Sequence, residues 1–121
     1  MSVNQAKKFP GEVLFESVAR VIQHLNLSSE EVRAMLGCSE RELQELLAGE
    51  EYSFVHKPPR HATYLIRIFF ALGKLFKHEA ADMQSWMRSH NKSLQAKPID
   101  RLVEEREFEL VIDFLESSLS R

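Results

Sequence analysis

The sequence contains few of the residues that interrupt helices or crosslink a chain. Its 121 residues include four glycines, four prolines and a single cysteine, Cys38. One cysteine excludes a disulfide within the chain, so we expect the reducing environment of the cytoplasm. Because glycine and proline are scarce and most charged residues are helix formers, the composition favours an all-helical fold. The length fits one compact unit or two small, tightly packed subdomains.

Long hydrophobic runs are also lacking. No apolar run approaches the roughly 20 residues that a helix needs to span a bilayer. Residues 1–8 are polar and contain no apolar core of the kind that secretory signals carry. We therefore predict no membrane partner and no export.

Motifs of catalysis and metal binding are missing as well. The five histidines are scattered, and the chain has no Cys-x-x-Cys, His-Glu-x-x-His or Gly-x-Ser-x-Gly sequence and no glycine-rich phosphate loop. We predict a protein that is not an enzyme and that uses no metal or cofactor.

Charge is distributed unevenly, although the net charge is only -2. Residues 28–51 hold seven acidic and two basic residues, and residues 98–121 hold seven acidic and three basic ones. Between them, residues 56–97 hold eight basic residues, two acidic ones and four histidines. Two interpretations are open. The blocks neutralise each other in the folded protein or its dimer, or the basic segment forms a surface for DNA phosphate or an acidic partner.

Two short helices with matching start signals follow a first predicted helix at residues 11–25. Ser28 and Ser39 are each followed three residues later by a glutamate, which is the spacing of a capping box. Gly37 ends the first short helix as a left-handed cap, and Gly49 ends the second. The three residues between the two helices give the spacing of a helix-turn-helix.

The second of these helices has mixed chemistry for reading DNA. Arg41 suits guanine and Gln44 suits adenine, but Glu40 and Glu45 face a polyanion at an unfavourable cost. The pair is either a DNA reader that needs a dimer, a partner or added phosphate contacts, or a packing scaffold. The candidate DNA contacts are Ser39, Arg41, Gln44, Lys57 and Arg60, with Arg67 as a further phosphate contact.

Residues 60–76 form the longest predicted helix, which starts after Pro58 and Pro59. Its broad apolar face, widened by Phe70, predicts a central core helix that joins two subdomains without a flexible linker. We expect Gly73 to mark a position of close packing.

Three further helices are predicted at residues 79–88, 96–103 and 105–119, after a break at Lys77 and His78. The last one has apolar residues at three- and four-residue spacing, which defines one wide apolar face. That face must cover the rest of the chain, a second copy or another protein. It consists of Phe108, Val111, Ile112 and Leu115.

The last third of the chain also contains an ordered series of short motifs. The series is Trp86-Met87, Asn91, Leu94, Pro98-Ile99-Asp100, Leu102 and Val111-Ile112-Asp113-Phe114-Leu115. In this order the motifs resemble the toxin-binding domain of the Xre/MbcA/ParS family of bacterial antitoxins, over roughly residues 65–119. The chain departs from the family at Gln95-Ala96 and near Glu107, where the family usually has glycine. The earlier turn, Leu36-Gly37-Cys38-Ser39, resembles that of an Xre-type DNA-binding domain. That domain has a small apolar residue at the position of Cys38, so the resemblance implies a buried, unreactive thiol.

The resemblance implies a type II antitoxin with a helix-turn-helix domain at residues 11–57. A toxin-binding and dimerisation domain follows at residues 58–121. It further implies a homodimer that binds operator DNA and a cognate toxin, typically an NAD-degrading or ADP-ribosylating enzyme whose active site the last helix and tail block. The implied toxin-binding or dimer residues are Trp86, Asn91, Leu94, Pro98, Asp100, Leu102, Val111, Asp113, Leu115 and Arg121.

Two other classes of function stay open. A stand-alone helix-turn-helix transcriptional regulator would bind DNA in a salt-dependent manner without any partner. A purely structural dimeric adaptor would bind neither DNA nor a toxin. An adjacent reading frame that encodes a small enzyme would favour the antitoxin over both alternatives.

Overall fold

The computed structural model describes residues 10–48 and 60–120. These two ranges form seven α-helices and no strand, which confirms the predicted all-helical class. The helices are α2 (Pro10–Leu25), α3 (Ser29–Leu36), α4 (Glu40–Leu47), α5 (Arg60–Phe76), α6 (Ala80–Arg88), α7 (Pro98–Val103) and α8 (Phe108–Leu119).

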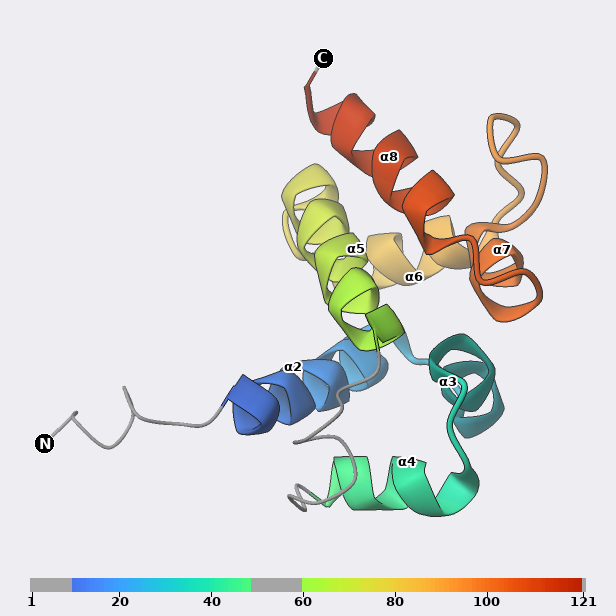
Figure 1. The fold of residues 1–121 in the computed structure, drawn as a ribbon. Coiled ribbons are helices and arrows are strands. Elements are labelled where there is room, and N and C mark those ends of the chain that lie inside the picture. The colour runs from blue at the N-terminus through green and yellow to red at the C-terminus, as the bar shows by residue number, and fades with distance from the viewer. Residues whose placement is uncertain (1–9, 49–59, 121) are drawn as a thin grey trace, which may run out of the picture.

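Helix α5 lies at the centre of the arrangement (Figure 1). Helix α8 runs alongside it, and α2, α3 and α6 also contact it. Helices α3 and α4 lie at one end of the molecule, and α7 connects α6 to α8 while packing against α3. The bounds of α5 agree with the predicted helix at residues 60–76, and its position confirms that it is the central core helix.

One continuous hydrophobic core connects the N-terminal and C-terminal helices. Leu65, Ile68 and Leu72 of α5 are fully buried at its centre. Leu25 of α2 and Leu115 of α8 are fully buried in the same cluster. Each such side chain contributes roughly 1.5–3 kcal/mol by leaving water. The boundary predicted between residues 57 and 58 lies outside the described residues.

The two short helices start as predicted. The Ser28 hydroxyl accepts from the backbone N–H of Glu31 at 3.1 Å, and the Ser28 N–H donates to the Glu31 carboxylate at 2.9 Å. Ser39 and Glu42 form the same reciprocal pair at the start of α4. Gly37 has a φ of 67°, the left-handed conformation that glycine adopts most readily. Gly49, the predicted end of α4, lies outside the described residues.

The break before α6 and the role of Gly73 also agree with the sequence. Lys77 and His78 have φ values of 54° and 60°, which end α5 sharply. The chain reversal brings the imidazole of His78 against the backbone of Gly73. A Cβ at Gly73 would lie 2.3 Å from the His78 ring, so a larger residue requires the ring to move.

Two expectations are wrong in detail. The last helix begins at Phe108 rather than near residue 105, because Arg106 adopts a φ of 51°. The Glu107 N–H donates to the carbonyl of Arg101 at 3.0 Å, which folds the link back onto α7 before α8 starts. Phe70 is 56% exposed rather than part of the core, because α8 and α6 pack on neighbouring faces of α5 and leave its side uncovered.

A single core predicts one cooperative unfolding transition for both halves of the chain. We expect Leu25→Ala in α2 and Leu115→Ala in α8 each to lower the free energy of unfolding by about 2–5 kcal/mol. Leu47→Ala is the control, because this side chain is 48% exposed and its loss should cost under about 0.5 kcal/mol. Urea titrations followed by circular dichroism and by Trp86 fluorescence test this. Transitions that separate between the two probes would contradict a shared core.

Candidate functional site

The outer face of α4 carries the predicted DNA-reading side chains. Arg41 and Gln44 are exposed, as the helix-turn-helix interpretation requires. Glu40 is exposed on the same helix, and Leu47 adds an apolar side chain at its end. The Ser39 hydroxyl is occupied by its capping bond. The face therefore mixes a cation, an amide, a carboxylate and an apolar group.

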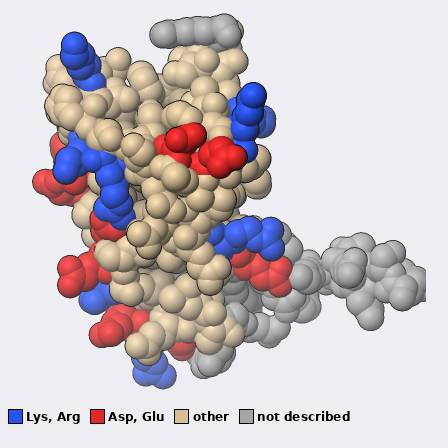
Figure 2. Space-filling view, turned by 180° about the vertical axis from the view of Figure 1, so that it is seen from behind, with Lys and Arg blue, Asp and Glu red and all other residues tan. Residues whose placement is uncertain are grey.

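The predicted phosphate contacts do not gather into a basic surface. Arg67 is bound by Glu116 through two hydrogen bonds of 2.9 and 3.0 Å. Lys57 lies outside the described residues, and of Arg60 only the backbone is described. On the face seen in Figure 2, basic and acidic side chains are interspersed around a largely uncharged centre. The basic and acidic blocks of the sequence thus neutralise each other at this ion pair.

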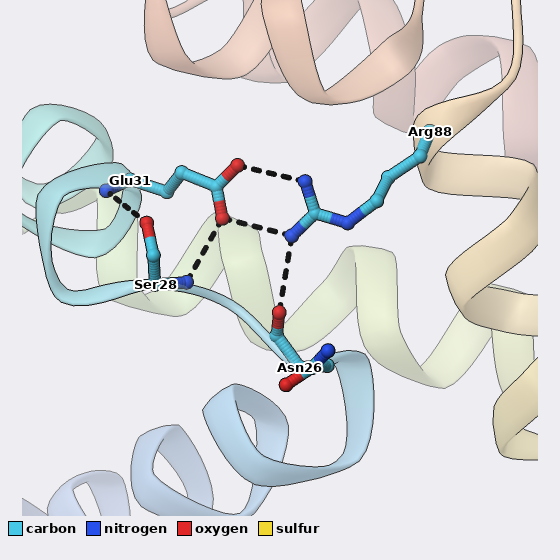
Figure 3. A network of polar contacts seen from close by, with 4 residues as sticks. All are labelled: Asn26, Ser28, Glu31 and Arg88. Atoms are coloured by element: carbon cyan, nitrogen blue, oxygen red, sulfur yellow. Dashed lines mark hydrogen bonds and ion pairs between the residues drawn. The ribbon is translucent and has the colours of Figure 1, made fainter.

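A second ion pair joins the acidic N-terminal block to the basic middle. Arg88 of α6 points at Glu31 of α3, and its two terminal nitrogens donate to the two carboxylate oxygens at 2.8 Å each (Figure 3). Arg88 also donates to the carbonyl of Asn26 at 3.0 Å. The hydrogen bond from Arg88, with help from Ser28, lowers the pKa of Glu31 from 4.5 to about 2. This fork fixes α3 against α6.

Arg101 holds together the segment that carries the family motifs. Its Nε donates to the carbonyl of Leu94 at 2.7 Å, and its Nη1 donates to Glu105 at 2.7 Å and to Glu107 at 3.1 Å. Asn91 shapes the preceding turn, because its side-chain oxygen accepts from the N–H of Leu94 at 3.1 Å. Sequence reasoning did not select Arg101. The sequence offers one indication of its role, because Arg101 stands four residues before Glu105, the spacing of an ion pair on a helix.

Two further side chains that sequence reasoning missed connect the C-terminal helices to the end of α3. Arg106 Nε donates to the carbonyl of Ala34 at 3.1 Å, and its guanidinium lies over Gly37. His61 Nδ1 lies 3.2 Å from the carbonyl of Met35. The His61 ring stacks on Phe108 with centroids 4.6 Å apart. Helix-terminal carbonyls need partners, and these two side chains serve α3 in that role.

The residues implied for toxin binding divide by burial. Asp113 is exposed, and Trp86, Asn91 and Asp100 are partly buried, with Trp86 stacked on Phe114 at 6.3 Å. Arg121 lies outside the described residues. The buried members shape the surface from beneath and have little area to offer a partner. They are Leu94, Pro98, Leu102, Val111 and Leu115.

Several exposed apolar side chains lie elsewhere on α5 and α8. Leu110 of α8 is 42% exposed at the edge of a cavity of about 240 Å³, which His61, Tyr64 and Arg106 help to line. Leu110 and Asp113 lie three residues apart on one outward face of α8. Phe70 of α5 and Leu119 of α8 line a separate groove.

Cys38 is half-buried rather than fully buried as predicted, because it lines an open depression beside Arg33 and Ala34. Burial raises the pKa of its thiol, and the nearby carboxylate of Glu42 raises it further. The thiol is therefore protonated at neutral pH, in keeping with an unreactive cysteine.

Within the described ranges, no three His, Cys, Asp or Glu residues gather as a metal site would require. None of the described helices is both long and apolar enough to cross a membrane.

These features define a small protein that is helical in the ranges the structure describes. Residues 71–118, from the second half of α5 through α8, match the family model of the antitoxin Xre/MbcA/ParS C-terminal toxin-binding domain. This segment is therefore similar to the Xre/MbcA/ParS toxin-binding domain, as the sequence motifs predicted. The match does not extend to α2, α3 or α4. No curated protein matches the chain.

The ion pair of Glu31 predicts a pH-dependent stability. The pKa of Glu31 is lower in the folded chain than its ordinary value of 4.5. Its contribution is therefore complete above about pH 4.5 and is lost as the pH falls toward about 2. We expect Glu31→Gln to lower the free energy of unfolding at pH 7 by about 1 kcal/mol, since solvent screens a partly exposed pair.

Urea titrations of wild type and Glu31→Gln between pH 7 and pH 3 measure this difference. Glu30→Gln is the matched control, because Glu30 is exposed in the same first turn of α3. The difference for Glu31 should shrink as the pH falls, whereas the control should differ little at any pH. A difference that stays constant with pH would contradict the role assigned to the carboxylate.

Proposed function

We propose that this protein is a cytoplasmic type II antitoxin that binds and neutralises a cognate toxin through residues 71–118. The observation that carries the proposal is the match of this segment to a toxin-binding domain family. The resemblance suggests an NAD-degrading or ADP-ribosylating toxin. The protein acts by covering the toxin's active site, a role that calls for a rigid surface and for no catalytic group of its own.

The outward face of α8 suits this contact best. Leu110 offers an exposed apolar side chain, and Asp113 offers a carboxylate beside it. Interfaces gain most of their affinity from a few such side chains that are desolvated at the centre. The buried Val111 and Leu115 hold the same helix against α5, so that the face is presented in one orientation. Arg121, which lies outside the described residues, follows α8 in the sequence and is a further candidate contact.

A tagged pull-down from native cells, with mass spectrometry of the captured proteins, identifies the toxin. We expect a stoichiometric small enzyme whose activity falls when the purified protein is added. Asp113→Lys should weaken this inhibition by roughly tenfold or more, since it reverses a charge at the interface. Asp82→Lys is the matched control, because Asp82 is exposed on α6 in the same domain.

Inhibition that is equal for wild type and Asp113→Lys would contradict the assigned face. Arg121→Ala tests the tail separately, and unchanged inhibition would remove it from the contact. Recovery of the homo-oligomer alone, without an enzyme, would remove the support for an antitoxin and favour a stand-alone regulator.

We further propose that the protein represses its own operon as a homodimer. The observation that favours this is the pair of capped helices joined by three residues, with Arg41 and Gln44 exposed on the second. Glu40 on the same face opposes phosphate, and Arg67 is held by Glu116. A homodimer presents a second copy of α4 to the DNA, which offsets the weak DNA contact of a single copy.

Fluorescence anisotropy with promoter DNA tests the DNA-binding part at several salt concentrations. We expect the affinity to fall as salt rises, and Arg41→Ala to weaken specific binding by about 1–3 kcal/mol. Arg20→Ala, which removes an exposed arginine of α2, is the control. Equal loss for both variants would indicate non-specific attraction. Binding that is full without toxin, in a protein that inhibits no enzyme, would favour the stand-alone regulator.

A further inference from the structure

A small pocket opens between the start of α5 and the start of α8, two helices that lie side by side (Figure 1). Its volume is about 240 Å³, and we call it the Tyr64 pocket. Pockets for small molecules usually enclose roughly 300–1,000 Å³, so the Tyr64 pocket suits a single side chain of a protein partner better than a cofactor. Its lining includes His61, Tyr64, Arg106, Glu107, Glu109 and Leu110.

Aromatic rings form one wall of this pocket. The ring centroids of His61 and Tyr64 lie 6.1 Å apart at an interplanar angle of 29°, and those of His61 and Phe108 lie 4.6 Å apart at 19°. The three rings are therefore close to parallel. Phe108 is buried, whereas His61 and Tyr64 are partly exposed. The planar guanidinium of an arginine stacks on such a wall, whereas the compact ammonium of a lysine has no plane to stack.

The imidazole of His61 also offers a hydrogen-bond acceptor. Its Nδ1 lies 3.2 Å from the carbonyl of Met35, and a carbonyl can only accept, so Nδ1 carries a proton. In the neutral ring the lone pair is then at Nε2. This nitrogen accepts a hydrogen bond from a donor such as a guanidinium N–H.

Carboxylates outnumber cations around the pocket. Glu109 is exposed and makes no ion pair with any residue that the structure describes. Glu107 shares Arg101 with Glu105, so one guanidinium serves two carboxylates. Asp113 follows Glu109 by four residues and is exposed on the same face of α8.

Arg106 is the cation of the lining, and its own contacts fix it on the side of α3. Its Nε donates to the carbonyl of Ala34 at 3.1 Å, and its guanidinium lies over Gly37. Its charge offsets one carboxylate. Glu109 and Asp113 still leave this side of α8 negative, and charge complementarity therefore selects a cationic side chain for the pocket.

We propose that the Tyr64 pocket receives an arginine side chain of the toxin. The guanidinium stacks on the ring of Tyr64, donates to Nε2 of His61 and pairs with Glu109. Leu110, which is 42% exposed at the edge of the pocket, covers the methylene groups of the arginine. This inference rests on the toxin binding of the proposed function. It extends the contact surface to the first turns of α5, which lie outside the matched residues 71–118.

Inhibition of the captured enzyme, titrated with variants of this protein, tests the two contacts. We expect Glu109→Arg to weaken inhibition by roughly tenfold or more, because it places a cation against the arginine. Tyr64→Leu should weaken inhibition by roughly fivefold, and Tyr64→Phe should restore most of this loss because it keeps the ring face. Glu79→Arg is the matched charge control, since Glu79 is exposed before α6 and lies outside the pocket. Circular dichroism establishes that all variants are folded.

Modification of the toxin with phenylglyoxal, which reacts with arginine, identifies the occupant by mass spectrometry. We expect one toxin arginine to be protected in the complex with wild type and to react in the complex with Glu109→Arg, at antitoxin concentrations that saturate the toxin. Replacing that arginine by glutamate should weaken binding to wild type and restore binding to Glu109→Arg, since opposite charges then meet again.

The proposal is wrong if Glu109→Arg inhibits as well as Glu79→Arg, or if both complexes protect the same toxin arginines. Stronger inhibition by Glu109→Arg would indicate an anionic occupant and would overturn the proposal as well. In each of these cases wild type still inhibits the enzyme, so the antitoxin function stands without the pocket. A pull-down that captures no enzyme removes the antitoxin function, and the inference with it.

Discussion

The burial of α5 from several sides is the constraint on which the rest of the structure depends. Leu65, Ile68 and Leu72 are fully buried, and no single neighbouring helix is large enough to cover them. Helices α2, α3, α6 and α8 therefore all pack against α5. The consequence is that the segment matched to a toxin-binding domain, which begins inside α5, does not have a core of its own. Its surfaces are held in place partly by the N-terminal helices.

Ion pairs reinforce this arrangement at the surface. Glu31 and Arg88 join α3 to α6, and Arg67 and Glu116 join α5 to α8. In both cases a basic residue from the middle of the sequence meets a carboxylate from a flanking acidic block. The uneven charge distribution therefore serves internal pairing at these positions, which leaves less positive charge for DNA than the sequence alone suggested. Pairs this exposed contribute modestly to stability, and their larger effect is to fix the relative orientation of helices.

Local signals predicted much of the fold. The two capping boxes, the left-handed Gly37 and the limits of α5 depend on residues close together in sequence, and all agree with the structure. The start of α8 was not predictable in this way. Arg106 takes a left-handed conformation because of the tertiary contacts of its neighbours, and arginine carries no sequence preference for it.

The sequence predicted the family that the candidate site resembles, but it predicted the contacting residues less well. The ordered motifs of the last third identified the toxin-binding family, but most of their hydrophobic members, such as Leu102, are buried. A motif records what a domain needs in order to fold as well as what it needs for binding, and periodicity alone does not separate the two. The sequence analysis did not choose Arg101 as a site residue and placed Phe70 in the core, for different reasons. Arg101 acts partly through the backbone carbonyl of Leu94, a contact that the sequence does not show, whereas Phe70 lies on a helix apolar enough to suggest complete burial.

The contacts at the end of α3 bear on how the two proposed activities communicate. Arg106 and His61 hold the carbonyls of Ala34 and Met35, next to the turn that leads into α4. Phe108, the first residue of α8, stacks on the same His61. A hinge between α3 and the toxin-binding segment would break these hydrogen bonds and expose part of a shared core, at a cost of several kcal/mol. If toxin alters DNA binding in this protein, the effect is therefore expected to come through the number of copies assembled and their combined charge, with each chain moving as one body.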